Sequence, residues 1–226
     1  MIDKYYLMVL DELKSITQQS LDQLGNKSSI PNHYSDLMYY LETNTTDPIE
    51  KNMIKNAAHQ LQLSNICLLS GLYRQAFSSL RLTFEISLGS IFLSLFKLDQ
   101  LAWVNNKHDI SWSRMTSEED GLFSKKFIEL HSPGIEAERD RLFKKANKTY
   151  RELSEYVHGN NKTWTTKDPA LKLNLTEIDS YYTLTESVAE IFITTWFIKN
   201  YKEIDSDNFE YEKFQEFPKI KEYFKH

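Results

Sequence analysis

The rarity of proline and glycine is the feature that most restricts how this chain can fold. Only five prolines and six glycines occur in 226 residues, and every proline falls where an apolar helical pattern starts or stops. Long segments with helical periodicity lie between these breaks. The sequence therefore predicts an all-α fold, an antiparallel bundle of four to five main helices with short satellite helices.

Capping signals and apolar periodicity define the expected helices. Asp47, Pro48 and Glu50 form a capping-box pattern ahead of one of them. The segment 72–98 is apolar on nearly every side, which is typical of a helix at the centre of a bundle. The expected helices span residues 3–24, 32–42, 47–69, 72–98, 118–130, 134–158 and 176–202, with a short aromatic helix at the C-terminus. We expect loops or a short helix over 102–117, and a loop with a possible short extended piece over 160–175.

The length and composition are those of one domain, residues 1–226. An apolar content of 41% can supply a substantial core without disulfides or metal. The only cysteine, Cys67, lies in an apolar run, so we expect a buried thiol and a cytoplasmic location. No secretory signal is visible. The longest apolar runs, 86–96 and 191–198, are shorter than the roughly 20 residues that cross a bilayer, so no membrane association is expected.

The net charge is −5, so the molecule as a whole does not attract nucleic acid. A polyanionic partner has to be held by a local basic patch. Such a patch is predicted between Arg139 and Arg151, where six basic residues stand against one aspartate.

A helical wheel of residues 136–158 separates an apolar face from a basic one. The predicted apolar face carries Leu142, Phe143, Ala146, Tyr150, Leu153 and Val157. The predicted outer face carries Arg141, Lys144, Lys145, Lys148 and Arg151. His158 follows Arg151 by seven residues, almost two whole turns, so both side chains are expected on the outer face, about 10 Å apart along the axis. A substrate phosphate fits between them.

Two other interpretations apply to this helix end. Basic residues and a histidine ahead of Gly159 also complement the helix macrodipole at a capped C-terminus. Glu155 and His158 match the Glu-x-x-His pattern of di-iron bundles, but no second such motif is present, so no metal site is expected. Glu85 and Glu190 interrupt the two most apolar helices, and each is expected to be paired within the bundle, Glu85 with Arg81.

An all-α bundle with arginine, six residues and histidine on a late helix resembles the HEPN superfamily (higher eukaryotes and prokaryotes nucleotide-binding). The motif here is Arg151 to His158, within YRELSEYVHG. Together with GLYRQAFSSLRLTFE at 71–85, it is similar to uncharacterised bacterial HEPN-like proteins. The resemblance covers about residues 50–200.

The resemblance implies a homodimer in which two Arg/His pairs meet and cleave RNA without metal or another cofactor. Histidine can move the proton of a ribose 2′-hydroxyl, and arginine can hold the scissile phosphate. We expect Arg151 and His158 to be catalytic. Four residues are expected to bind substrate, and two carboxylates to support the site. The substrate-binding residues are Lys144, Lys148, Asn160 and Trp164, and the supporting residues are Glu85 and Glu155.

The expected function is a metal-independent endoribonuclease of toxin or phage-defence type, with RNA or a nucleotide as ligand and a protein antitoxin as a possible partner. Glu152 departs from the small polar residue that active members often carry directly after the arginine. A carboxylate there repels RNA. It favours the alternative, a non-catalytic HEPN-like module that binds a nucleotide or a protein partner. A plain helical structural protein is the third hypothesis.

Overall fold

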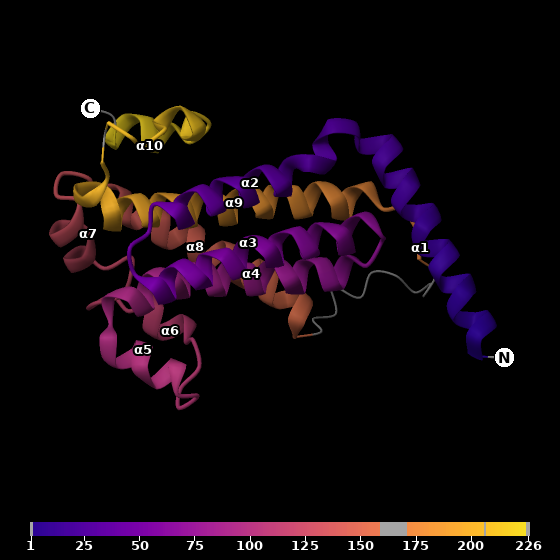
Figure 1. Ribbon diagram of the computed structural model, residues 1–226, viewed down its shortest axis with the longest axis horizontal. Coiled ribbons are helices and arrows are strands. Elements are labelled where there is room, and N and C mark those ends of the chain that lie inside the picture. Colours follow the sequence, from indigo (N-terminus) through magenta and orange to yellow (C-terminus); the bar gives the residue numbers. More distant parts are fainter. Residues whose placement is uncertain (1, 159–170, 206, 225–226) are drawn as a thin grey trace.

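The computed structural model describes residues 2–158, 171–205 and 207–224, and the part of the chain so described is helical without strands. Five long helices form an antiparallel bundle (Figure 1). They are α2 (Ile30–Thr43), α3 (Pro48–Leu69), α4 (Tyr73–Leu95), α8 (Glu138–Val157) and α9 (Leu175–Asn200). Shorter elements surround them: α5 (Lys97–Val104), α6 (Trp112–Met115), α7 (Lys125–His131), α10 (Pro218–Tyr223) and 3-10 turns at Gly25–Ser29, Tyr201–Glu203 and Tyr211–Phe214. The predicted all-α class is confirmed.

The centre of the bundle is formed by α4 and α9. α4 contacts α3, α8 and α9, and α3 is its most extensive partner. Phe77, Phe84 and Trp196 are among the largest side chains that are completely buried there. By length and apolar composition α4 could cross a membrane, but 67% of its most apolar window is buried inside the bundle. Such burial is typical of a core helix.

Local signals at both ends of α3 explain its bounds. The Asp47 carboxylate accepts hydrogen bonds from the backbone N–H groups of Ile49 (3.0 Å) and Glu50 (2.8 Å), which confirms it as the N-cap. The Glu50 side chain, expected to complete a capping box, instead forms a buried ion pair with Lys199 of α9. At the other end Gly71 has φ +77°, and the Leu72 N–H donates to the carbonyl of Cys67 (2.9 Å). The positive φ of Gly71 and this hydrogen bond together end the helix at a glycine C-cap.

Three predicted helix bounds were wrong. The helix expected over 72–98 ends at Leu95, because Phe96 leaves the helical conformation and stacks on Phe92. The helix expected over 118–130 begins only at Lys125, because Ser124 is its N-cap and accepts a hydrogen bond from the Phe127 N–H (3.1 Å). The helix expected from 134 begins at Glu138, because Gly134 has φ +105°.

Cys67 is half-buried rather than buried, and burial still raises the pKa of its thiol.

α1 (Ile2–Leu24) lies across one end of the bundle (Figure 1). Its C-terminal half packs on the α3–α4 turn: Thr17 Oγ1 lies 3.1 Å from Ser70 Oγ, and a Cβ on Gly71 would lie 3.2 Å from a methyl group of Ile16. The N-terminal half extends beyond the bundle.

Candidate functional site

The candidate site lies on α8, whose buried face is rotated from the predicted one. Leu142, Ala146 and Leu153 are buried as predicted. Thr149 is also buried, whereas Tyr150 and Phe143 are half-buried and Val157 is exposed. In the last turn the contact is made by Tyr156, which stacks on Phe77 of α4 with ring centroids 3.8 Å apart. The buried side chains therefore follow steps of four and three residues, the spacing of one helix face.

Arg151 and His158 both lie exposed on the solvent side of α8, as predicted. Arg151 belongs to the helix, and His158 is its C-cap residue, with its N–H donating to the carbonyl of Ser154 (3.0 Å). Seven residues separate them, so their axial distance is about 10 Å. Neither side chain bonds to any other residue in the described ranges 2–158, 171–205 and 207–224. Both are thus available to a ligand.

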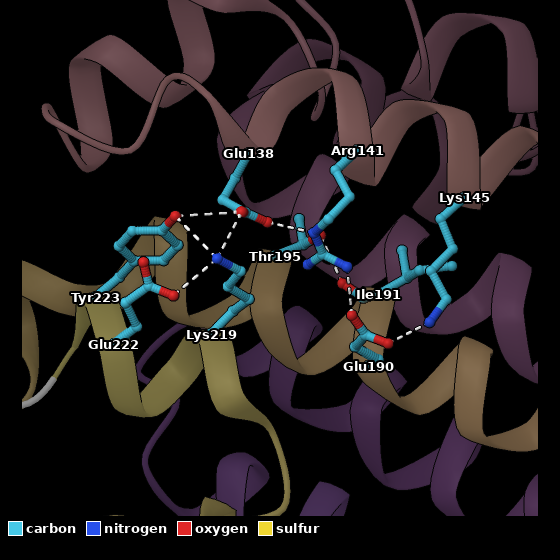
Figure 2. A network of polar contacts seen from close by, with 9 residues as sticks. All are labelled: Glu138, Arg141, Lys145, Glu190, Ile191, Thr195, Lys219, Glu222 and Tyr223. Carbon is cyan, nitrogen blue, oxygen red and sulfur yellow. Dashed lines mark hydrogen bonds and ion pairs between the residues drawn. The ribbon is translucent and has the colours of Figure 1, made fainter.

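The predicted basic outer face is much smaller than the sequence indicates. Arg141 donates to Glu138 and to Glu190, both at 2.5 Å, and Lys145 also pairs with Glu190 (Figure 2). Although burial raises the pKa of Glu190, its bonds to Lys145 and Arg141 lower it below the ordinary value overall. Arg141 and Lys145 therefore join α8 to α9 and do not belong to a free basic surface.

Three further basic residues were predicted near the Arg151–His158 pair, and each has a different environment. Arg139 donates to the carbonyl of Phe123 (3.0 Å) and pairs with Asp140 (2.8 Å). Lys148 is exposed and lies 3.8 Å from the carboxylate of Glu152. Lys144 is exposed and bonds to no residue in the described part of the chain. The basic surface beside the pair thus reduces to Lys144 and Lys148.

A groove between α8 and α9 lies next to this surface and is acidic. Its volume is about 560 Å³. Its lining combines carboxylates, hydroxyl groups and one leucine: Glu152, Glu155, Tyr156, Thr176, Asp179, Ser180, Thr183 and Leu184. Glu155, predicted to support the catalytic pair, faces this groove. Tyr156 donates to Glu177 (3.2 Å), and its burial, with the nearby Glu177 charge, raises the pKa of the phenol.

Glu85 is paired with Arg81, as predicted, and not with Arg151 or His158. Arg81 Nη2 donates to Glu85 (3.0 Å) and to the hydroxyl of Tyr150 (2.8 Å). Tyr150 in turn stacks on Trp112, with ring centroids 3.9 Å apart, and Trp112 Nε1 donates to Asn147 (3.2 Å). Glu85 thus reaches α8 only through Arg81 and Tyr150.

Sequence reasoning did not find this cluster of Arg81, Tyr150, Trp112 and Asn147. Only the four-residue spacing of Arg81 and Glu85 signalled part of it. Two other predicted site residues, Asn160 and Trp164, lie outside the described residues. The structure therefore leaves Arg151, His158, Lys144 and Lys148 exposed on α8, with Glu155 facing the adjacent groove and Glu85 paired with Arg81 on α4.

The chemistry of this surface is that of anion binding and proton transfer. An arginine fork binds a phosphate through two parallel N–H groups, and an exposed imidazole can accept or donate a proton. Among the described residues no three His, Cys, Asp or Glu side chains converge as metal ligands.

Comparison with protein-family models, with curated proteins and with solved structures gave no match.

Proposed function

We propose that this chain is a metal-independent endoribonuclease of toxin or phage-defence type, with its active site completed by a second copy. The observation that supports the proposal is the exposure of Arg151 and His158 on one side of α8, uncommitted to any described residue, while Arg139, Arg141 and Lys145 are held in ion pairs. Side chains left free on an exposed surface are available to a substrate.

In the proposed reaction His158 of one copy accepts the proton of a ribose 2′-hydroxyl, whose oxygen attacks the adjacent phosphorus. The bond from phosphorus to the 5′-oxygen breaks, and His158 of the other copy donates a proton to that leaving oxygen. The products are a 2′,3′-cyclic phosphate and a 5′-hydroxyl. Arg151 holds the non-bridging oxygens, on which negative charge builds in the transition state. The two histidines exchange roles in the next turnover.

RNA is expected to follow the exposed surface of Lys144 and Lys148, because the groove on the other side of Glu152 is acidic and repels phosphate. Asn160 and Trp164 are proposed to extend the RNA contact. Glu85 and Glu155 are proposed to support the site indirectly. A protein antitoxin is the proposed inhibitor, and the cytoplasm the proposed location.

One observation favours a second function, a non-catalytic module that binds a nucleotide or a protein partner. Glu152 follows Arg151 directly and lines the acidic groove with Glu155 and Asp179. A basic protein segment matches that charge better than RNA does. Cleavage of RNA by the purified protein therefore distinguishes the catalytic function from the binding function.

The test is cleavage of mixed RNA by purified protein in the presence of EDTA. His158→Ala and Arg151→Ala are each expected to lower the rate by about 100-fold or more, because each removes one positioned catalytic group. His59→Ala, which removes an exposed histidine from α3, is the matched control and should cut at the wild-type rate. All three variants should melt within a few degrees of wild type, since the side chains are exposed.

Equal cleavage by wild type and His158→Ala would contradict the catalytic assignment. Absence of cleavage by the wild type across varied RNA would favour the binding module. Activity that disappears with EDTA would contradict a mechanism that uses only arginine and histidine.

A further inference from the structure

A single apolar stripe runs along α1 from Ile2 to Ile16, and the bundle covers only its C-terminal part. The stripe carries Ile2, Tyr6, Val9, Leu13 and Ile16, spaced by four and three residues as in a helix-pairing seam. Ile16 is 5% exposed and packs on Gly71 at the α3–α4 turn. In the first turns, Ile2 is 72% exposed and Tyr6 61%. The same stripe that anchors α1 to the bundle is therefore open at its N-terminal half.

The open half, residues 2–13, carries six exposed large apolar side chains. Beside Ile2 and Tyr6 its exposed large apolar side chains are Tyr5, Leu7, Met8 and Leu10. At 100° per residue Ile2, Tyr5, Tyr6 and Leu10 lie on the stripe or at its edges, and Leu7 and Met8 lie on the opposite side of the helix. At about 100 Å² for each half-exposed large side chain, the four on the stripe side present roughly 400 Å². An apolar patch of a few hundred Å² on a monomer is often functional, and a stable dimer buries about 800 Å² per partner, to which the half-buried Val9 and Leu13 of the same stripe add.

We propose that residues 2–13 of α1 pair antiparallel with the same residues of a second copy. This inference rests on the proposed function, because it identifies the surface that holds the homodimer of the composite site. The C-terminal half of each α1 is anchored to its own bundle. Antiparallel pairing of the N-terminal halves therefore places the two bundles at opposite ends of the helix pair.

The register follows from the spacing of the stripe. Tyr6 lies against Val9 of the partner subunit, and Ile2 lies against Leu13 of the partner subunit. At one edge of the seam Tyr5 faces the partner's Glu12, a phenol opposite a carboxylate. At the other edge Asp3 faces the partner's Leu10. No two like charges oppose each other, and the antiparallel helix dipoles attract.

The charges of this segment favour a second copy over a lipid surface. Residues 2–14 contain three acidic side chains, Asp3, Asp11 and Glu12, and two basic ones, Lys4 and Lys14. Amphipathic helices that bind anionic membranes carry an excess of lysine and arginine on their polar face. The polar face of α1 has no such excess.

The proposed interface lies at the end of the bundle that carries Arg151 and His158. Tyr156 of α8 stacks on Phe77, about one turn into α4. The start of α4 adjoins Gly71, on which Ile16 of α1 packs. The His158 end of each α8 therefore lies at the end of its own bundle to which α1 is anchored.

The experiment compares oligomeric state by light scattering on the full chain at micromolar concentration. Wild type is expected to be a dimer. The double variant Tyr6→Glu, Leu10→Glu is expected to dissociate at least about 100-fold more readily, because two carboxylates then lie in an apolar seam. Leu98→Glu is the matched control: Leu98 is 82% exposed on α5, and this variant should remain a dimer. Circular dichroism checks that both variants remain folded.

Cross-linking tests the register. In a Cys67→Ser background, an equal mixture of Tyr6→Cys and Val9→Cys proteins should form a disulfide-linked dimer faster than either protein alone. Equal or faster cross-linking of the single proteins would overturn the antiparallel register. A monomeric wild type, or a monomer that binds neutral or anionic vesicles through α1, would overturn the interface itself.

The RNA assay separates this inference from the proposed function. A dimer that behaves as described but cuts no RNA leaves the interface standing and contradicts the ribonuclease. A monomer that cuts RNA leaves only the ribonuclease activity standing and contradicts both the interface and the two-copy active site.

Discussion

Tyr150 joins the candidate site to the core of the bundle. Its ring stacks on Trp112, and its hydroxyl accepts a hydrogen bond from Arg81, which also binds Glu85. The next residue, Arg151, is exposed. Arg81 Nε is buried and has no partner among the described residues, so the bonds of the other guanidinium nitrogens are needed to compensate its burial.

Replacing Tyr150 by phenylalanine should therefore destabilise the fold by about 1–2 kcal/mol, the cost of losing one hydrogen bond to a buried charged group. Urea unfolding measures the difference. Tyr39→Phe is the matched control, since the Tyr39 hydroxyl bonds to no described residue, and it should unfold like the wild type. If both variants unfold at the wild-type urea concentration, the Arg81–Tyr150 bond contributes no stability.

Residue-level predictability depended on distance along the chain. The Arg81–Glu85 pair could be predicted because its partners lie one helical turn apart. The contacts of Arg141 and Lys145 with Glu190 could not, because Glu190 lies more than forty residues further on and only packing brings α9 against α8. A wheel of α8 alone therefore assigned both cations to a free surface.

At the scale of the element, α8 shows how a correct helix can have a wrong register. Its apolar period predicted Leu142, Ala146 and Leu153 as buried, and all three are. In the last turn the wheel placed Val157 on the apolar face, but Val157 is exposed and Tyr156 makes the contact instead. Tyr156 stacks on Phe77, and that contact depends on the α4–α8 packing.

The corrected register predicts opposite results for two truncations on α8. Leu153→Ala should cost about 2–5 kcal/mol, because it leaves a cavity in a fully buried position. Val157→Ala should stay within about 0.5 kcal/mol, as at other exposed positions. Thermal or urea unfolding of both variants measures this. Comparable losses at the two positions would restore the register predicted from the sequence.

At the scale of the whole molecule, an ionic network connects three parts of the chain that are remote in sequence. Glu138 and Arg141 of α8, Glu190 of α9 and Lys219 of α10 lie close together in Figure 2. Tyr223 adds a hydrogen bond to Glu138 (3.2 Å). The C-terminal segment is thereby held against α8 by charge as well as by its buried aromatic side chains.

This network predicts an acid-sensitive stability. The pKa of Glu190 in the fold lies below its ordinary value of 4.5, since the bonds to Lys145 and Arg141 outweigh burial. The ionised carboxylate therefore stabilises the fold above pH 4.5, and that stability is lost as the pH falls toward the folded pKa. Glu190→Gln should be less stable than wild type at pH 7 and should approach it in acid.

Urea midpoints measured from pH 7 to pH 3 provide the test. Glu186→Gln, an exposed position one turn earlier on α9, is the matched control and should parallel the wild type. A constant difference between Glu190→Gln and wild type across this range would show that the carboxylate charge is not responsible.

The short α3–α4 turn at Gly71 has a consequence for the entropy of the chain. α3 and α4 share the most extensive helix–helix contact in the described structure, yet only residues 70–72 separate them. The entropy lost on bringing two segments together grows with the length of chain between them. Forming the most extensive helix–helix interface, between α3 and α4, therefore costs little chain entropy. The contact between α2 and α9 costs more, because more than a hundred residues separate these helices.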